Sequence, residues 1–239
     1  MRLLVDFLCR FGWGMAAALA ATPASLVPAG FYRVNLLVVL GLASVAAFLA
    51  RAEVPGLTWV LAAAAAVTAW LGSVVWLGER VRAGLACCGL CAALLGAATV
   101  LVQDRSGVAA AGEALVSGLV VGLTVHAMLL GHWYLNAPGM RVDALRRMID
   151  VALLAWGVQL AASLAGVVAA GGWGVAGDAT TGALLSLRWL AGLAGLPVLL
   201  IMSRKTLDIP NTQSATGILY VACLAAILGE LTAQLLRAA

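Results

Sequence analysis

Eight long apolar runs, separated by short polar joints, limit how this chain can fold more than any other feature. The runs cover about residues 3–23, 31–50, 56–77, 83–103, 112–135, 147–171, 180–203 and 212–236. A helix of about 20 apolar residues crosses the hydrocarbon core of a bilayer, so each run is long enough to span a membrane. Their length and continuity predict helices, because barrel strands would alternate over about ten residues.

The amino-acid inventory excludes a water-soluble fold. Of 239 residues, 64% are hydrophobic and 10% are charged, and the mean hydropathy is +1.08. A polar shell around a soluble core cannot be built from so few polar side chains. Because the eight runs account for nearly the whole chain, we expect a single all-α integral membrane domain over residues 1–239, a polytopic bundle of about eight transmembrane helices.

The basic residues predict how this bundle is oriented. The net charge of +4 is spread over the joints, which favours contacts with membrane lipids and not with nucleic acid. One side of the membrane holds Arg33, Arg80, Arg82, Arg141, Arg146, Arg147, Arg204 and Lys205, and the other holds Arg2, Arg51, Arg105 and Arg237. The richer side is expected to be cytoplasmic, which places both termini outside a membrane that we expect to be a bacterial cytoplasmic membrane.

The first run has a second interpretation. Met1 and Arg2, followed by an apolar stretch that ends in small residues, are typical of a cleavable signal peptide. Asp6 and Arg10 interrupt the apolar stretch and favour a first transmembrane helix instead. With a spacing of i and i+4, these two side chains face each other and partly neutralise their charges at the membrane edge.

Both histidines of the chain, His126 and His132, lie in the fifth run. Gly118 and Gly122 form a GxxxG motif there, which permits close approach of another helix or of a flat ligand. The histidines are separated by about 120° around a helix and by about 9 Å along it, so they cannot be opposite axial ligands of one iron. Haem b would need a ligand from a second copy or a partner, whereas a quinone needs one imidazole beside an apolar slot. Alternatively, both histidines only bond to neighbouring helices.

Two polar groups are predicted to lie at the same depth near the cytoplasmic side. His132 and Tyr134 end the fifth run, while Gln213, Thr216 and Tyr220 share one face of the last helix. The positive end of the last helix dipole lies beside them. Together these five side chains predict a pocket for a quinone or a lipid headgroup.

Arg188 and Glu230 are expensive residues to bury in a bilayer. Counted along their helices from the non-cytoplasmic side, they fall at comparable depth. An Arg188–Glu230 ion pair would let both be buried. The functional alternative is a proton or cation path with Glu230 as the carrier and His126 as a further member.

The fourth run contains Cys87, Cys88 and Cys91, of which the last two form a CxxC motif. Metal or redox chemistry would require thiolates and usually further ligands. In an apolar membrane run, cysteine more often packs as a small hydrophobic residue. We therefore predict no metal site, and the role of these cysteines stays open.

The functional hypothesis that follows is a membrane subunit of an electron-transfer or respiratory-type complex. Its eight-helix layout is similar to that of quinol-reactive anchors of respiratory oxidoreductases, although none of their motifs occurs here. Such a subunit would bind quinone, or less readily haem b. It would need other protein subunits or a second copy, because the runs leave almost no extramembrane mass to hold Fe–S clusters or a catalytic domain. The alternatives are a small transporter or channel that uses Arg188, Glu230 and His126, and a structural scaffold subunit.

Overall fold

The computed structural model describes residues 1–54, 56–103, 107–137, 139–169, 178–209 and 211–238, and it is helical over nearly all of them. The helices are α1 Arg2–Ala21, α2 Ala29–Glu53, α3 Thr58–Leu77, α4 Val81–Leu101, α5 Val108–Asn136, α6 Asp143–Ala169, α7 Ala179–Leu187, the π-helical segment η1 Arg188–Gly195, α8 Leu196–Thr206 and α9 Thr212–Ala238. Since α7, η1 and α8 run on as one span, eight spans are long and apolar enough to cross a membrane. The predicted polytopic helical membrane bundle is confirmed. Arg105 and the predicted end of the sixth run at residue 171 lie outside the described residues.

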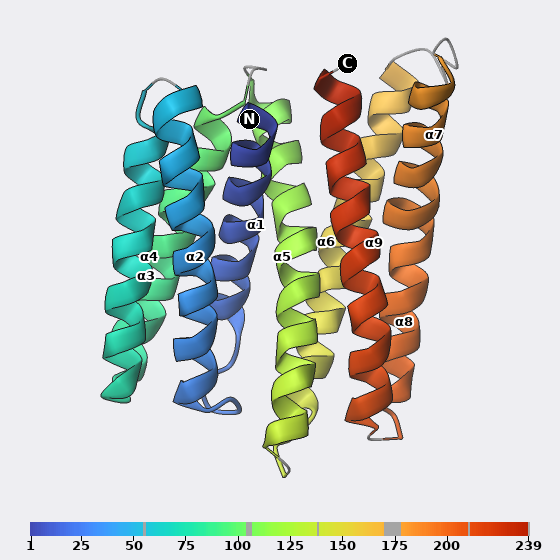
Figure 1. Cartoon of the computed structure of the whole chain (residues 1–239). Helices are drawn as coiled ribbons and strands as arrows, with labels where there is room; N and C mark the ends of the chain where they lie inside the picture. The colour runs from blue at the N-terminus through green and yellow to red at the C-terminus, as the bar shows by residue number, and fades with distance from the viewer. Residues whose placement is uncertain (55, 104–106, 138, 170–177, 210, 239) are drawn as a thin grey trace.

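The spans run roughly parallel and form two groups that meet at α5 (Figure 1). Helices α1 to α4 lie on one side of α5, and α6 to α9 lie on the other. Helix α5 packs against α1 and also against α6 and α9. Helix α1 begins and α9 ends at the same end of the bundle, which we call the terminal face; the other end is the opposite face.

Glycines bring α1 and α5 into backbone contact. A Cβ atom on Gly14 of α1 would overlap the carbonyl oxygen of Gly118, and one on Gly122 would overlap the backbone of Gly14. A Cβ on Gly118 would lie 2.6 Å from the carbonyl oxygen of Arg10. The GxxxG motif of the fifth run therefore accommodates another helix, as small residues at membrane helix interfaces do. This contact places Arg10 directly against α5.

The seventh span is irregular because of Pro197. Proline has no N–H group, and its ring displaces the carbonyl four residues earlier, which here is Leu193. The backbone forms the π-helical segment η1 immediately before it, and the carbonyl oxygen of Leu193 accepts a hydrogen bond from Trp156 Nε1 of α6 at 3.2 Å. The polar group that proline leaves unpaired is thus satisfied by a neighbouring helix, as irregular backbone at membrane depth requires.

Segment η1 also lies unusually close to α9. A Cβ atom added to Gly192 would come within 2.8 Å of the Cα atom of Gly229. Gly229 precedes Glu230, and Arg188 lies one helical turn before Gly192. The Gly192–Gly229 contact therefore sets how near Arg188 and Glu230 come to each other.

Candidate functional site

Arg10 is the centre of a buried hydrogen-bond network, and only 1% of its surface is exposed. Its Nε donates to Asp6 Oδ1 at 2.8 Å, its Nη1 donates to Ser117 Oγ at 2.9 Å and to Glu230 Oε1 at 3.0 Å, and its Nη2 donates to Gln103 Oε1 at 2.9 Å. Four of the five N–H groups of this guanidinium are thereby satisfied. At a rise of about 1.5 Å per residue, Arg10 and Glu230 each lie about 12 Å from the terminal face. The predicted Asp6–Arg10 pair is present, and it belongs to a network that joins α1, α5 and α9.

Gln103 links this network to the edge of the membrane. Its Nε2 donates to Asp6 Oδ1 at 2.7 Å and to the carbonyl oxygen of Thr99 at 2.9 Å. The side chain of Asp6 is 15% exposed, whereas that of Arg10 is 1% exposed. Polar groups therefore continue from the terminal face to Arg10 and Glu230.

The two carboxylate oxygens of Glu230 have different environments. Oε1 accepts from Arg10 and also from Gln234 Nε2 at 2.9 Å. Oε2 is buried and has no hydrogen-bond partner among the described residues. An unmatched buried acceptor is costly, by about 1–3 kcal/mol or more for a charged group. Such an atom at membrane depth is a candidate for binding a proton, a water molecule or an ion.

The expected Arg188–Glu230 ion pair is not formed. Glu230 pairs with Arg10 instead, at 3.0 Å, and Arg188 Nη2 donates to Ser163 Oγ of α6 at 3.0 Å. The sequence places Arg188 and Glu230 at similar depth, but Arg10 is at that depth too. Close packing of α1 on α5 brings Arg10 to the carboxylate, which depth alone could not reveal.

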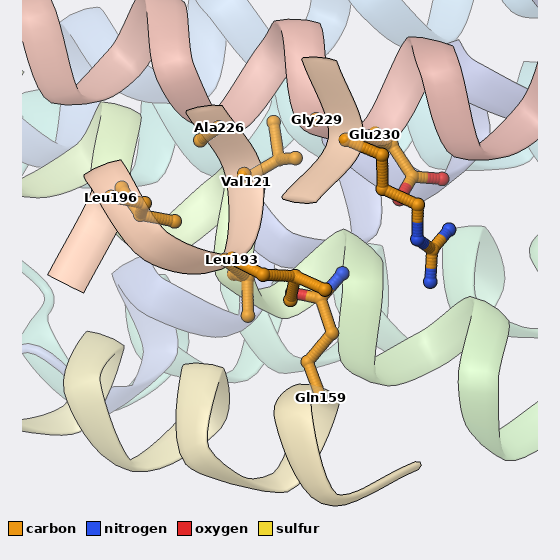
Figure 2. A pocket seen from close by; sticks show the side chains of 10 residues that line it. Val121, Gln159, Leu193, Leu196, Ala226, Gly229 and Glu230 are labelled. Carbon is orange, nitrogen blue, oxygen red and sulfur yellow. The ribbon is translucent and has the colours of Figure 1, made fainter. Parts of the chain in front are cut away.

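Arg188 and Glu230 nevertheless line one cavity, between α5, α6, η1 and α9 (Figure 2). The volume open to a water molecule is about 10 Å³, about the room that one water needs. The lining residues are Val120, Val121, Gln159, Arg188, Gly192, Leu193, Leu196, Ala226, Gly229 and Glu230. Three of these are polar and the rest are apolar or glycine. Gln159 extends from α6 toward η1, while Glu230 enters from α9.

His126 lies apart from this cavity. It is fully buried, its Nε2 is 2.7 Å from Thr22 Oγ1, and that hydroxyl also donates to the carbonyl oxygen of Ala18 at 2.7 Å. Because Thr22 has one hydroxyl proton, the imidazole Nε2 is the donor in this pair, and Nδ1 is left without a partner. His126 is about 13 Å from Ser117 along α5, so it does not share a site with Glu230.

The five residues expected to form a cytoplasmic-side pocket are only partly brought together. Tyr220 Oη lies 3.3 Å from His132 Nδ1, and both side chains are exposed on the surface of the bundle. Tyr134 is turned inward and donates to the carbonyl oxygen of Arg141, and Thr216 is buried against Gly131. Gln213 is exposed.

The cysteines pack among apolar helices. Cys88 and Cys91 are buried, Cys87 is half-buried, and all three are free thiols. Cys91 Sγ donates to the carbonyl oxygen of Ala65 of α3 at 3.6 Å. Over the described part of the chain, no group of three His, Cys, Asp or Glu side chains is placed to hold a metal ion.

The sequence analysis missed Gln103 and Ser117 as members of the network. It also missed Arg10 as the partner of Glu230. One signal was available: Arg10 is a cation within an apolar run, at the same distance from its helix end as Glu230 from its own. Ser117 precedes Gly118, so its position on the α1-facing side of α5 follows from the glycine contact. The pairing itself needed the order of the helices in space.

The fold and this network define a polytopic helical membrane protein with a charged cluster and a small cavity in the terminal half of the bundle. Comparison of the chain with protein-family models, curated proteins and solved structures found no match. The function is therefore argued from the site itself.

Proposed function

We propose that this protein is a small membrane transporter or channel that moves protons, with Glu230 as the group that takes up and releases the proton. The observation that carries this proposal is the buried Oε2 of Glu230, which has no hydrogen-bond partner in the described part of the chain and belongs to a side chain that lines a water-sized cavity. Ionisable side chains at membrane depth face cavities or partners and commonly belong to ion or proton pathways.

A proton suits this site better than a metal cation does. Glu230 is paired with Arg10 at 3.0 Å, and Arg188 lines the same cavity. A metal cation would be placed between two guanidinium groups in a medium of low dielectric constant, where charge repulsion is strong. A proton binds covalently to Oε2 and needs no further oxygen ligands.

The test is proton flux into liposomes that contain the purified protein and a pH-sensitive dye. An inward proton gradient is imposed in potassium chloride, with valinomycin present so that potassium holds the membrane potential near zero. We expect rapid internal acidification with the natural chain and background acidification with Glu230→Gln. Glutamine keeps an oxygen to accept from Arg10, so the network retains most of its hydrogen bonds.

Glu79→Gln is the matched control. Glu79 is exposed in the joint between α3 and α4 at the opposite face, so loss of its charge should leave the flux unchanged. Gel filtration and helical content show whether each variant is folded. Background flux from the natural chain, or full flux from a folded Glu230→Gln variant, would refute the proposal.

A second candidate function is a membrane subunit of a respiratory-type electron-transfer complex. One observation favours it: His132 and Tyr220 lie 3.3 Å apart on the exposed surface between α5 and α9, where an imidazole and a phenol could both bond to a quinone oxygen arriving from the lipid. Redox partners would then be other subunits or a second copy. Stoichiometric quinone in the purified protein that is lost in His132→Ala supports this function, and an absorption band of b-type haem would favour haem over quinone.

The orientation belongs to the same proposal. The arginine-rich joints lie at the opposite face, and we place that face in the cytoplasm of a bacterium by the positive-inside rule. A green fluorescent protein fused after α9 should then stay dark, because it does not mature when it is exported unfolded. A bright fusion would reverse the orientation.

A further inference from the structure

The charges around the cavity balance only while Glu230 is ionised. Helix α1 contributes Arg10 and Asp6, which pair at 2.8 Å, η1 contributes Arg188, and α9 contributes Glu230. Two positive and two negative charges sum to zero. Nearer the terminal face, Glu113 of α5 and Arg237 of α9 pair with each other at 3.7 Å, and α6 adds only the uncharged Gln159 and Ser163 to the site.

Protonation of Glu230 leaves this cluster with one uncompensated positive charge. Arg10 keeps Asp6 as its carboxylate partner. Arg188 forms no ion pair within 4 Å among the described residues, and Ser163 Oγ accepts from its Nη2. The excess charge therefore belongs to Arg188, beside the cavity. An isolated charge in a medium of low dielectric constant is unfavourable unless a counter-charge reaches it.

We propose that the cavity binds one small monovalent anion of halide size beside Arg188 when Glu230 is protonated, so that proton and anion cross the membrane together. This inference rests on the proposed function and names its second substrate. The step forms an O–H bond at Glu230 Oε2 and breaks an O–H bond of a hydronium ion, which leaves water, while the anion enters from solution and no other covalent bond changes.

The cavity has the chemistry that a halide requires. Arg188 carries five N–H donors, of which the bond to Ser163 uses one, and the amide of Gln159 extends into the same space. The other lining residues are apolar or glycine, which leaves a weakly hydrated ion few competing partners. A volume of about 10 Å³, about the room that one water molecule needs, limits the site to one small ion and excludes organic anions.

The two binding steps must favour each other. A bound anion makes protonation of Glu230 more favourable, and protonation of Glu230 makes anion binding more favourable by the same free energy. Protonation without the anion, or the anion without protonation, would leave the cavity with a net charge. The coupling therefore predicts transport that is electroneutral and depends on both ions.

The experiment repeats the proton-flux measurement with gluconate, a bulky anion, in place of chloride at equal ionic strength. We expect proton influx to be about tenfold or more faster in chloride, a ratio within the usual range of coupling between two sites. An inward proton gradient should also drive uptake of radioactive chloride. Equal proton influx in chloride and gluconate would overturn this inference and leave the proposed function standing, whereas no influx in either salt would overturn both.

Variants separate the two sites. In Arg188→Gln, proton influx in chloride should fall to the gluconate rate, while Arg188→Lys keeps a charge and should retain part of the difference. In Glu230→Gln, where the side chain is always neutral, chloride uptake should no longer depend on the pH gradient. Arg141→Gln, which changes an exposed arginine at the opposite face, serves as the control and should behave like the natural chain. Unchanged chloride dependence in a folded Arg188→Gln variant would refute the assignment.

Discussion

The two ends of helix α5 hold polar side chains in opposite environments. Near the terminal face, Ser117 is 1% exposed and belongs to the network around Arg10. At the opposite face, His132 is exposed and its neighbour Tyr220 is 47% exposed. The second pair lies on the outer surface of the bundle, where groups outside the chain can reach it, so its geometry is free to be loose. The buried network has only protein partners, and almost every donor of Arg10 is matched.

Glu230 and its neighbour Gln234 are the exceptions in this network. Glu230 is buried as deeply as Arg10, yet among the described residues its Oε2 has no hydrogen-bond partner, and neither has Oε1 of Gln234. A polar atom without a partner is unremarkable at an exposed helix end and costly in a membrane interior. That contrast is the reason to assign function to Glu230 before His132.

Removing one partner of the buried ion pair should have the largest effect on stability. Arg10→Met leaves Asp6 and Glu230 without their cation, and breaking a buried pair costs about 3–5 kcal/mol. The free energy of unfolding can be measured by titration with sodium dodecyl sulfate in mixed micelles. Adding Glu230→Met to the same chain removes one of the stranded charges and should restore much of the loss. A single variant as stable as the natural chain would show that the network is not maintained in the membrane.

The close contact of α1 with α5 should be the next most sensitive feature. Gly14→Val puts side-chain atoms where the backbone of Gly118 lies, and overpacking costs about 1–3 kcal/mol. Arg10 would also move away from Ser117. Gly41→Val is the control, because nothing lies within 4 Å of a Cβ atom at that position. Equal stability of the two variants would contradict the packing of α1 on α5.

Two tyrosines near the opposite face test burial with identical chemistry. Tyr134 is 5% exposed, and its hydroxyl donates to the carbonyl oxygen of Arg141. Because Tyr134→Phe removes this donor, we expect the free energy of unfolding to fall by about 1–2 kcal/mol. Tyr220→Phe removes an exposed bond at 3.3 Å and should cost less than about 0.5 kcal/mol. Melting in detergent, followed by tryptophan fluorescence, measures both. Equal losses of stability in the two variants would contradict the exposed position of Tyr220.

The smallest effect is expected at a charge outside the membrane spans. Asp178 accepts hydrogen bonds from the backbone N–H of Thr181 at 3.0 Å and from its hydroxyl at 2.8 Å, which lowers the pKa of this carboxyl below its usual 3.8. Because the folded pKa lies below the unfolded one, the stabilisation is present above about pH 4 and is lost as the pH falls through the folded value.

Asp178→Ala should therefore lower the melting temperature slightly at neutral pH, and the difference from the natural chain should disappear in acid. Asp178→Asn keeps an acceptor for the first turn of α7, so its offset from the natural chain should be smaller at neutral pH. A difference that grows in acid would contradict the sign of this shift.

Much of the fold could be predicted from the sequence, because helix formation in a bilayer depends on local composition. The expected boundaries of the first and fourth runs, 3–23 and 83–103, lie within two residues of α1 and α4. The Asp6–Arg10 pair follows from helical spacing alone. The glycine pair in the fifth run indicated a close helix contact without indicating that α1 makes it.

The site was less predictable because its partners come from helices far apart in the chain. The sequence predicted Arg188 as the partner of Glu230 and placed Arg10 with Asp6 at the membrane edge. The packing of α1 between α4 and α5 makes Arg10 the partner instead. The cavity depends on the π-helical turn before Pro197 and on the Gly192–Gly229 contact. A proline at position 197 disfavours a regular helix there, but nothing in the local sequence shows that Trp156 bonds to the carbonyl oxygen of Leu193.

The sequence by itself determined that this chain spans a membrane as a helical bundle, since hydrophobic length and backbone hydrogen bonding leave no other solution. It also placed Glu230 within a membrane-spanning run. The tertiary structure alone decided how those residues pair, which carboxylate oxygen stays unmatched and where a cavity opens beside it. The physical reason is that burial is a property of each run, whereas ion pairing depends on distances between runs that no single helix encodes.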